Sequence, residues 1–466
     1  MGIKMEKENK FEYFRKKMEK ENIPSLVIDI FNKHYQKLTS GINTYISDND
    51  IKPVENLPHL TDILEEYSEK ADKINQKTVI IKLNGGLGTG MGMECAKSLI
   101  KAKNDISFLE IIARQSMKNN QKLILMESFA TYEDSKKTLD SIMPQEKEIA
   151  RHFIQNKVPK VQRHDLMPAV FPQNPNLEWC PPGHGDIYTS LVISGILDSL
   201  IKNDIEFAFI SNADNLGAVM EKAIPAYMAE NKIPFLMEVA ERELEDRKGG
   251  HIAIGKNGKI ILRELAQCPD KDLNHFQNIK KHCYFNTNSI WINLKSLAKK
   301  LKKNNNWLEL PLIINKKTVD PRDLNSTPVY QLETAMGCAI SSFEKASAVI
   351  VPRERFRPVK TTSDLALLRS DVYRLNSNDI IERTDKNKKL PFVLLDPKYY
   401  KNIDDMEKRF PNGIPSLKNC SSLKILGDVI ISNKVKLFGD VSIVNTTEKQ
   451  VTIPAGIKIT GEFVCS

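Results

Sequence analysis

A glycine-rich segment directly after a short β-branched run constrains this chain most. Thr78–Ile81 has the composition of a buried strand, and five glycines fall within the eight residues Gly85–Gly92. Such a backbone can approach an anion closely, so its amide groups can surround phosphate oxygens, and Lys97 adds a positive charge. Open α/β sheets bind ligands at the carboxyl ends of their strands, so the segment predicts a phosphate site. A merely flexible turn would explain neither the strand nor the lysine.

Two common phosphate-binding loops do not match this segment. A Walker loop needs glycine immediately before its lysine, and Ala96 stands there. The dinucleotide pattern G-x-G-x-x-G fails from each possible start, Gly86, Gly88 and Gly90. The sequence therefore argues against a P-loop NTPase and against a nicotinamide-dependent dehydrogenase.

The middle of the chain has the pattern of an open, mainly parallel α/β sheet. Further β-branched runs at Lys122–Met126, Phe207–Ile210 and Phe235–Val239 alternate with helical stretches. The residues before Thr78 are rich in charge and nearly free of glycine, and the apolar residues among them recur at helical spacing. This pattern predicts a helical N-terminal region. A polar stretch at Arg383–Lys389 looks like a loop or boundary. We predict three parts: a helical region 1–76, a central α/β domain 77–385 and a C-terminal domain 386–466.

The C-terminal part carries a short internal repeat. Similar phrases occur at Leu423–Val429, Val435–Val441 and Ile457–Phe463, and the first two are twelve residues apart. Two units of six residues suggest coils of a parallel β-helix, with the third copy displaced by a loop at Asn445–Lys449. A small antiparallel hairpin domain is the alternative, because three short repeats are near the minimum for a stable solenoid.

Composition and targeting signals narrow the class of protein. With 41% hydrophobic and 27% charged residues the chain is ordinary for a globular protein, and its net charge of +9 is only a mild lean toward anionic partners. Seven scattered cysteines form no C-x-x-C pair, which indicates a reducing compartment. The first twenty residues lack an apolar run. We expect a cytoplasmic protein that binds neither nucleic acid nor membrane.

The glycine-rich segment resembles the nucleotide-binding signature of the eukaryotic-type UTP:glucose-1-phosphate uridylyltransferases, the UDP-glucose pyrophosphorylases. The resemblance continues in order along most of the chain, in five further phrases: Pro181–Tyr188, Ser211–Gly217, Phe285–Asn288, Gln331–Ala335 and Arg357–Leu365. It implies a Rossmann-like nucleotidyltransferase core with a mixed, mainly parallel sheet and a C-terminal left-handed parallel β-helix. It also implies joining of UTP to glucose 1-phosphate with release of pyrophosphate.

This chemistry brings two highly charged anions together, so positive charge is its central requirement. Resemblance places Lys97 at the triphosphate and Lys360 beside the reacting phosphates, as the catalytic cations. Mg²⁺ is the implied cofactor, with Asp214 as its protein ligand, since Mg²⁺ takes one or two carboxylates and completes its shell with phosphate and water. An Asx turn or helix cap is the alternative for Asp214. Ala96 replaces a proline usual in the family, which puts the rigidity of the loop in question.

The remaining site residues follow from the same resemblance. His184, between two glycines, is assigned to glucose 1-phosphate, although a lone histidine is more often structural. Gln155 is assigned to uracil, whose imide edge a side-chain amide can complement, and a surface glutamine is the alternative. The other predicted contacts to the nucleotide are Leu83, Asn84, Gly85, Gly86, Gly183 and Asn212; those to the sugar phosphate are Asn212, Asp214, Gly250, Glu264 and Asn288. We expect Cys95 to be a spectator.

Two other functions remain open. A relative that uses N-acetylglucosamine 1-phosphate would share the reaction but usually has different loop phrases, without His184. A non-catalytic nucleotide-sugar sensor could dispense with Lys97, Asp214 and Lys360, yet all three are present. Copies of the chain could also pair through exposed coils of the β-helix.

Overall fold

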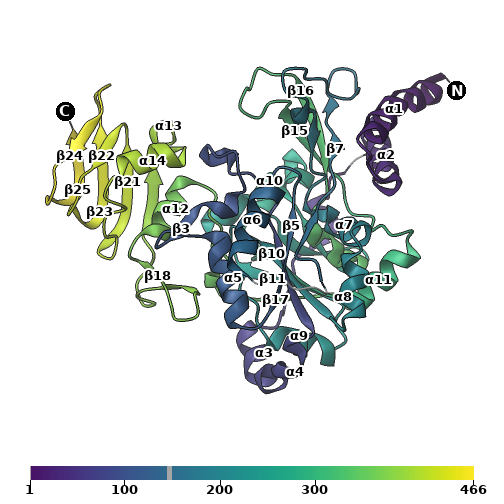
Figure 1. The fold of residues 1–466 in the computed structure, drawn as a ribbon, viewed down its shortest axis with the longest axis horizontal. Helices are drawn as coiled ribbons and strands as arrows, with labels where there is room; N and C mark the ends of the chain where they lie inside the picture. Colours follow the sequence, from purple (N-terminus) through teal and green to yellow (C-terminus); the bar gives the residue numbers. More distant parts are fainter. Residues whose placement is uncertain (1, 43, 144–148, 466) are drawn as a thin grey trace.

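A ten-stranded sheet forms the centre of the computed structural model, which describes residues 2–42, 44–143 and 149–465 (Figure 1). Its main path is β1-β12-β14-β10-β2-β5-β6, with β13 beside β12, β11 beside β14 and β17 beside β11. The strands are β1 (Ile51–Lys52), β2 (Thr78–Leu83), β5 (Lys122–Glu127), β6 (His152–Ile154), β10 (Phe207–Asn212), β11 (Phe235–Glu241), β12 (His251–Gly255), β13 (Ile260–Arg263), β14 (Tyr284–Asn293) and β17 (Ser347–Ile350).

The sheet is mixed and mainly parallel, as the sequence predicts. Strands β2, β5, β6 and β10 pair in parallel, and the pairings also align β11, β12 and β17 with them. Strands β1, β13 and β14 run in the opposite direction. The chain leaves β2 toward β5 and returns on its other side at β10, so the order of strands reverses beside β2. The glycine-rich segment thus begins at a topological switch point, where open α/β sheets bind ligands.

Helices cover both faces of the sheet. Successive strand residues point to opposite sides, so apolar side chains of one strand pack against helices on each face. Ile80 packs with α5, α6 and α9 on one face, whereas Val79 and Ile81 pack with α7, α8 and α11 on the other. The helices of this part are α5 (Phe108–Lys118), α6 (Tyr132–Ile142), α7 (Ile187–Ile193), α8 (Ile196–Lys202), α9 (Ala223–Glu230), α10 (Leu273–Phe276), α11 (Leu294–Lys303) and α12 (Thr362–Arg369).

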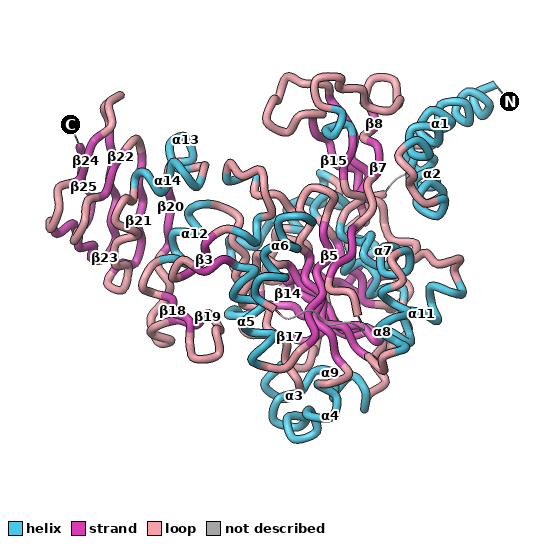
Figure 2. Tube along the Cα trace, viewed as in Figure 1, coloured by secondary structure: helices cyan, strands magenta, loops and turns pink. Residues whose placement is uncertain are grey.

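Smaller sheets of two or three short strands lie around this core (Figure 2). They are β3 (Lys101–Lys103) with β4 (Ile106–Ser107), β7 (Val158–Pro159) with β9 (Trp179–Cys180), β8 (Val161–Gln162) with β16 (Pro328–Glu333) and β15 (Ile313–Thr318), and β18 (Tyr373–Leu375) with β19 (Ile381–Arg383). The polar stretch predicted as a loop therefore begins inside β19, at Arg383, and is a loop from residue 384 onward.

The N-terminal region is helical, as predicted, and also contributes a strand. It contains α1 (Gly2–Lys20), α2 (Ser25–Thr39), α3 (Leu60–Tyr67) and α4 (Ala71–Asn75). In Figure 1 the first two helices lie against the upper right of the molecule and the last two beneath the sheet. Between them, β1 pairs antiparallel with β12 and so joins the central sheet. At two residues β1 is too short to leave a periodic signal in the sequence.

The C-terminal part is built from parallel strands, which excludes the antiparallel hairpin alternative. Strands β20 (Phe392–Leu395), β21 (Cys420–Leu426), β23 (Lys436–Asn445) and β25 (Lys458–Cys465) form one parallel sheet. Strands β22 (Val429–Ile431) and β24 (Val451–Ile453) form a second. Two short helices, α13 (Pro397–Tyr400) and α14 (Ile403–Arg409), precede them. One apolar cluster runs from the central sheet into these strands, through residues such as Leu423, Ile443 and Ile459.

Candidate active site

The glycine-rich segment leaves β2 and lies between the carboxyl ends of β5 and β10. The Asn84 N–H donates to the Met126 carbonyl at 2.7 Å, and the Ala213 N–H donates to Leu83 at 3.1 Å. Further on, the Lys97 N–H donates to the Gly86 carbonyl at 3.1 Å, which closes the segment into a compact lobe. Residues 83–86 therefore lie directly beside Asp214.

Lys97 and Asp214 form an ion pair in this region. The Lys97 Nζ lies 2.5 Å from Asp214 Oδ2, and each side chain is less than a fifth exposed (18% and 16%). The second carboxylate oxygen, Oδ1, is buried and has no hydrogen-bond partner among the described residues. The Asx turn that the sequence left open belongs to the neighbour Asn215, whose Oδ1 accepts from the Gly217 N–H at 3.2 Å. The Asp214 carboxylate thus has an oxygen available for another ligand.

Lys360 is tied to the same loop through the backbone. The Val359 N–H donates to the Asp214 carbonyl at 3.1 Å. The Asp364 carboxylate accepts from the Lys360 N–H at 2.9 Å and caps α12 in a capping box with Thr361. The Lys360 side chain is exposed in the larger of two cavities, and no ion pair to it occurs among the described residues. The backbone bond from Val359 therefore joins the segment that carries Lys360 to the loop that carries Asp214.

Two cavities share this edge of the sheet and bring every predicted site residue together. A cavity of about 360 Å³ is lined by Leu83, Asn84, Gly85, Gly86, Lys97, Gln155, Gly183 and Asp214, among others. A cavity of about 870 Å³ is lined by Gly250, Glu264, Asn288 and Lys360, among others. His184 and Asn212 line both cavities. Their side chains stand where the contents of the two cavities would meet.

His184 is a neutral hydrogen-bond donor in this arrangement. Its Nδ1 accepts from the Met336 N–H at 3.0 Å, so the proton of the neutral ring lies on Nε2. Burial, and then the charge of Lys360, lowers the pKa of His184 to about 4. The backbone on either side is fixed by Thr334, which accepts from the Gly185 N–H and donates to the Pro182 carbonyl. His184 thus accepts a structural hydrogen bond, as a lone histidine often does, and it also lines both cavities.

Gln155 lies over Gly85, and it is not the surface residue that the sequence left open. It is only 7% exposed, and a Cβ at Gly85 would stand 2.3 Å from its Nε2. A side chain at position 85 would therefore displace the Gln155 amide from its present place. The Asn84 residue also lines this cavity, and its side-chain Nδ2 donates to Ser135 Oγ at 2.8 Å.

The wall of the larger cavity contains Gly250 and Glu264 in close contact. A Cβ at Gly250 would stand 2.5 Å from a Glu264 carboxylate oxygen. Burial raises the pKa of Glu264, and Asn286 and Lys360 partly offset this effect. Beside them, Asn288 Nδ2 donates to Asn212 Oδ1 at 2.8 Å. The carboxylate and amides make this wall suited to hydroxyl groups.

Several residues of the site carried no individual prediction. Arg357 and Asn286 line the larger cavity and stand in phrases that the sequence did single out. Arg353 holds Asp246 with two close contacts, at 2.7 and 2.9 Å, and this pair left no local signal. Lys82 is fully buried below the Asp214 loop, where its Nζ donates to Ser211 Oγ at 2.7 Å and to the Ala218 carbonyl at 2.8 Å. Burial lowers the pKa of Lys82 to about 7.

Comparison with known proteins gives consistent matches. The family model described as UTP--glucose-1-phosphate uridylyltransferase matches residues 28–437. The UTP--glucose-1-phosphate uridylyltransferase of Solanum tuberosum is 37% identical over 410 residues, which cover 86% of this chain and 84% of that protein. The enzyme of that name from Saccharomyces cerevisiae is 37% identical over 85% of this chain and 79% of its own length.

Solved structures agree over nearly the whole length. A UDP-glucose phosphorylase from Trypanosoma brucei is 41% identical and has a TM-score of 0.89, covering 98% of this chain and 100% of its own. A mutant UDP-glucose pyrophosphorylase from Leishmania major in complex with UDP-glucose is 39% identical with a TM-score of 0.88, covering 98% of each chain.

Proposed function

This chain belongs to the UTP--glucose-1-phosphate uridylyltransferase family, and we propose that it joins UTP to glucose 1-phosphate, forming UDP-glucose and releasing pyrophosphate. One observation supports this most strongly. The glycine-rich segment, the Lys97–Asp214 pair and the Lys360 segment meet at one edge of the sheet, where two cavities share His184 and Asn212. We assign the nucleotide to the cavity lined by the glycine-rich segment and the sugar phosphate to the cavity lined by Lys360.

In the proposed reaction an oxygen of glucose 1-phosphate forms a bond to the α-phosphorus of UTP. The bond from that phosphorus to the bridging oxygen of the β-phosphate breaks, and pyrophosphate leaves. The backbone amides of Gly85 and Gly86 bind phosphate oxygens, while Lys97 and Lys360 neutralise the charge that accumulates on them. Gln155 reads the edge of uracil, and the Nε2–H of His184 donates to the sugar phosphate. Catalysis is then positioning and electrostatic stabilisation.

The sugar is proposed to lie against the wall formed by Gly250, Glu264, Asn288 and Asn212. A magnesium ion is proposed at Asp214, whose buried Oδ1 has no partner among the described residues. Across residues 2–42, 44–143 and 149–465, no group of three His, Cys, Asp or Glu side chains could hold a metal. A single carboxylate nevertheless suits Mg²⁺, because phosphate oxygens and water fill most of its coordination shell. When bound, the ion would offset phosphate charge.

A coupled pyrophosphate assay tests the function. We expect release of pyrophosphate from UTP with glucose 1-phosphate, and at least about tenfold lower kcat/KM with N-acetylglucosamine 1-phosphate, whose acetamido group adds bulk. If calorimetry showed that the protein binds UDP-glucose but it turned over neither sugar phosphate, it would instead be a non-catalytic nucleotide-sugar sensor. Equal rates with both sugar phosphates would contradict the proposed specificity.

Replacing Gly85 by alanine is expected to raise the KM for UTP about tenfold, the loss of roughly one hydrogen bond. The new Cβ would stand 2.3 Å from Gln155 Nε2 and displace that amide. Gly90→Ala is the matched control, because a Cβ at Gly90 meets nothing within 4 Å. Steady-state kinetics with both substrates measure the effect. An unchanged KM for UTP in Gly85→Ala would argue against a role for Gln155 in base recognition.

The contribution of His184 is expected to be independent of pH above about 5.5, because its pKa is lowered to about 4. The measurement is the ratio of kcat/KM between the wild type and His184→Gln from pH 5.5 to 9, which cancels titration of the substrates. A change in that ratio near pH 6.5 would show that the ring titrates normally. The same pKa shift affects the free energy of unfolding. The imidazole of the unfolded chain titrates near 6.5, so the contribution of His184 to folding stability is full above that pH. It declines as the pH falls from 6.5 toward 4.

The predicted β-helix and the pairing of copies through its coils belong with this proposal. Successive strands β21 to β25 alternate between two parallel sheets, which supports coils of a parallel β-helix. Pairing of copies through these coils stays a prediction.

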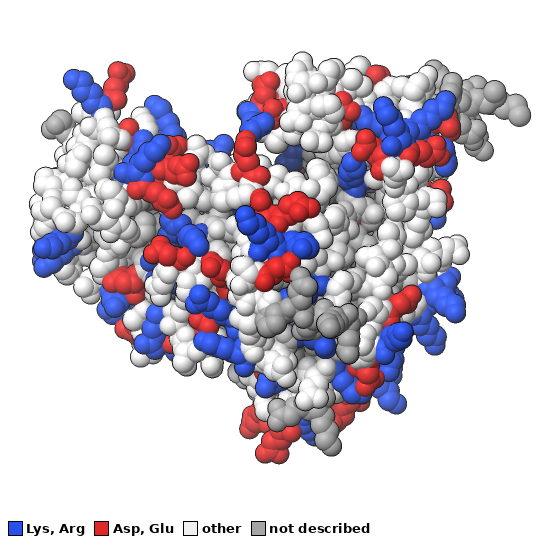
Figure 3. All heavy atoms as spheres, in the orientation of Figure 1, with Lys and Arg blue, Asp and Glu red and all other residues white. Residues whose placement is uncertain are grey.

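On the face shown in Figure 3, acidic and basic side chains are interspersed. No helix in the described residues is long and apolar enough to cross a bilayer.

A further inference from the structure

Residues 46–52, which we call the N-terminal clasp, are bonded to both sides of the β12–β13 hairpin. The Ile46 N–H donates to the Gln267 carbonyl at 2.7 Å. Ser47 Oγ and the Asp48 N–H both donate to Asp272 Oδ2, at 3.0 and 2.8 Å. At the other end of the clasp, β1 pairs with β12 through Ile51↔Gly255 and Lys52↔Ile254. The clasp therefore holds β12 and the loop after β13 together.

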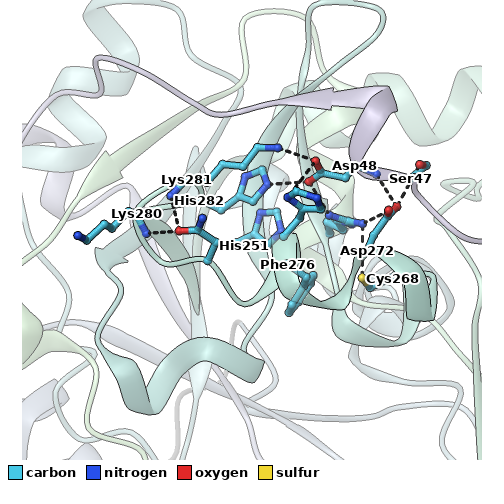
Figure 4. Close-up of polar contacts among 12 residues, drawn as sticks. Ser47, Asp48, His251, Cys268, Asp272, Phe276, Lys280, Lys281 and His282 are labelled. Carbon is cyan, nitrogen blue, oxygen red and sulfur yellow. Dashed lines mark hydrogen bonds and ion pairs between the residues drawn. The ribbon is translucent and has the colours of Figure 1, made fainter.

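Asp48 is the centre of a buried charged cluster behind this hairpin (Figure 4). It is 8% exposed, and its Oδ2 lies 2.5 Å from Lys281 Nζ. Its Oδ1 lies 3.3 Å from His282 Nε2 and 3.6 Å from Arg263 Nη1. Burial alone would raise the pKa of Asp48, but the bonds from Lys281 and His282 outweigh it and lower that pKa. Asp48 is thus a buried carboxylate shared by several donors.

Arg263 forms a charge pair with this carboxylate. Its side chain is fully buried, and its guanidinium has two carboxylates nearby, Asp48 at 3.6 Å and Asp272 at 3.7 Å. It lies over the ring of Phe276, 5.6 Å from the centroid. On the same side, His251 stacks on His282 with centroids 4.0 Å apart, and burial lowers the pKa of His251 to about 2. Asp48 is thus faced by the side chains of Lys281 and Arg263 and by the rings of His282 and His275, the last at 4.0 Å.

The cluster stands directly behind the proposed sugar wall. His251 and Arg263 are cross-strand partners on β12 and β13. Gly250 precedes His251 and Glu264 follows Arg263. Because successive residues alternate sides in extended chain, Gly250 and Glu264 face the larger cavity while their neighbours face the cluster. The same short stretches of backbone carry both sets of side chains.

We propose that Asp48 is a positioning residue for the sugar side of the active site, acting through Arg263 on Glu264. Without the Asp48 charge, the buried Arg263 keeps one carboxylate, at 3.7 Å, and a buried charge that has lost a partner shifts toward other polar groups or water. Such a shift moves the adjacent Glu264, and displacements near 1 Å are costly in active sites. The inference rests on the proposed function, which assigns Glu264 and Gly250 to glucose.

The test is Asp48→Asn in the full-length protein, with the KM for each substrate measured separately. We expect the KM for glucose 1-phosphate to rise about tenfold and the KM for UTP to change less than about twofold. Asp48→Glu keeps the charge and is expected to recover most of the loss. Asp428→Asn is the matched control, since it removes a carboxylate 2.8 Å from Arg409 in the C-terminal part. It should lower thermal stability and leave both KM values unchanged.

An unchanged KM for glucose 1-phosphate in Asp48→Asn, or equal changes in both KM values, would overturn the inference. If that variant does not fold, Ser47→Ala removes only one hydrogen bond of the clasp and should raise the same KM about twofold. No change in Ser47→Ala would then count against the inference. A wild-type protein inactive with glucose 1-phosphate would instead count against the proposed function, so the two failures are distinguishable.

Discussion

Replacing Lys360 by methionine is expected to lower kcat about 10²- to 10³-fold, the range found when one preorganised charge-stabilising group is removed. The ammonium stands in the larger cavity near His184 and Glu264, whose pKa values both respond to its charge. Methionine keeps a long apolar stem, and the backbone contact to Asp364 does not involve the side chain. The loss should therefore appear in catalysis and not in folding.

The measurement is steady-state kcat at saturating substrates, together with a thermal melt. Lys386→Met is the control, because Lys386 is exposed in the loop after β19, outside both cavities. A Lys360→Met enzyme that keeps kcat within about threefold of the wild type would contradict a catalytic role for this lysine.

Replacing Asp214 by asparagine is expected to lower kcat about 10²- to 10³-fold and to raise the Mg²⁺ concentration needed for half-maximal rate at least about tenfold. Asparagine has nearly the same shape but lacks the charge that holds Lys97 at 2.5 Å and that would bind a cation through Oδ1. The loop itself should persist, since its bond from the Val359 N–H is to the Asp214 backbone carbonyl.

Titration of the rate with Mg²⁺ at fixed UTP measures the second effect. Lys97→Met separates the two roles of Asp214, because it removes the ion pair and leaves the carboxylate. We expect Lys97→Met to lower kcat with an almost unchanged Mg²⁺ requirement. If Asp214→Asn also left the Mg²⁺ requirement unchanged, Asp214 would not be the metal ligand.

The sequence predicted the parts of the fold that have a local signal. The β-branched runs locate β2, β5, β10 and β11, and the repeated C-terminal phrases locate β21, β23 and β25. Each of these strands buries alternating or continuous apolar residues, which leaves a periodic pattern. The direction of β14 and the presence of β1 could not be predicted, because pairing depends on contacts between distant segments and β1 has two residues.

The candidate site likewise has residues that the sequence could predict and contacts that it could not. The glycine-rich segment and the phrases around Asp214 and Lys360 are contiguous, so their residue types and spacing carried the prediction. Whether Gln155 faces solvent or Gly85 depends on how β6 lies beside β5, which the sequence does not specify. The contact between Asp48 and Arg263 joins the N-terminal region to β13 and has no local pattern at all.

A crystal structure with UTP and Mg²⁺ bound tests the central claim most directly. We predict the triphosphate against the Gly85 and Gly86 amides with Lys97 beside it, the metal at the Asp214 carboxylate, and uracil against Gln155. The larger cavity next to Lys360 should remain free for the sugar phosphate. UTP bound elsewhere, or bound with its phosphates away from residues 85–97, would contradict the account.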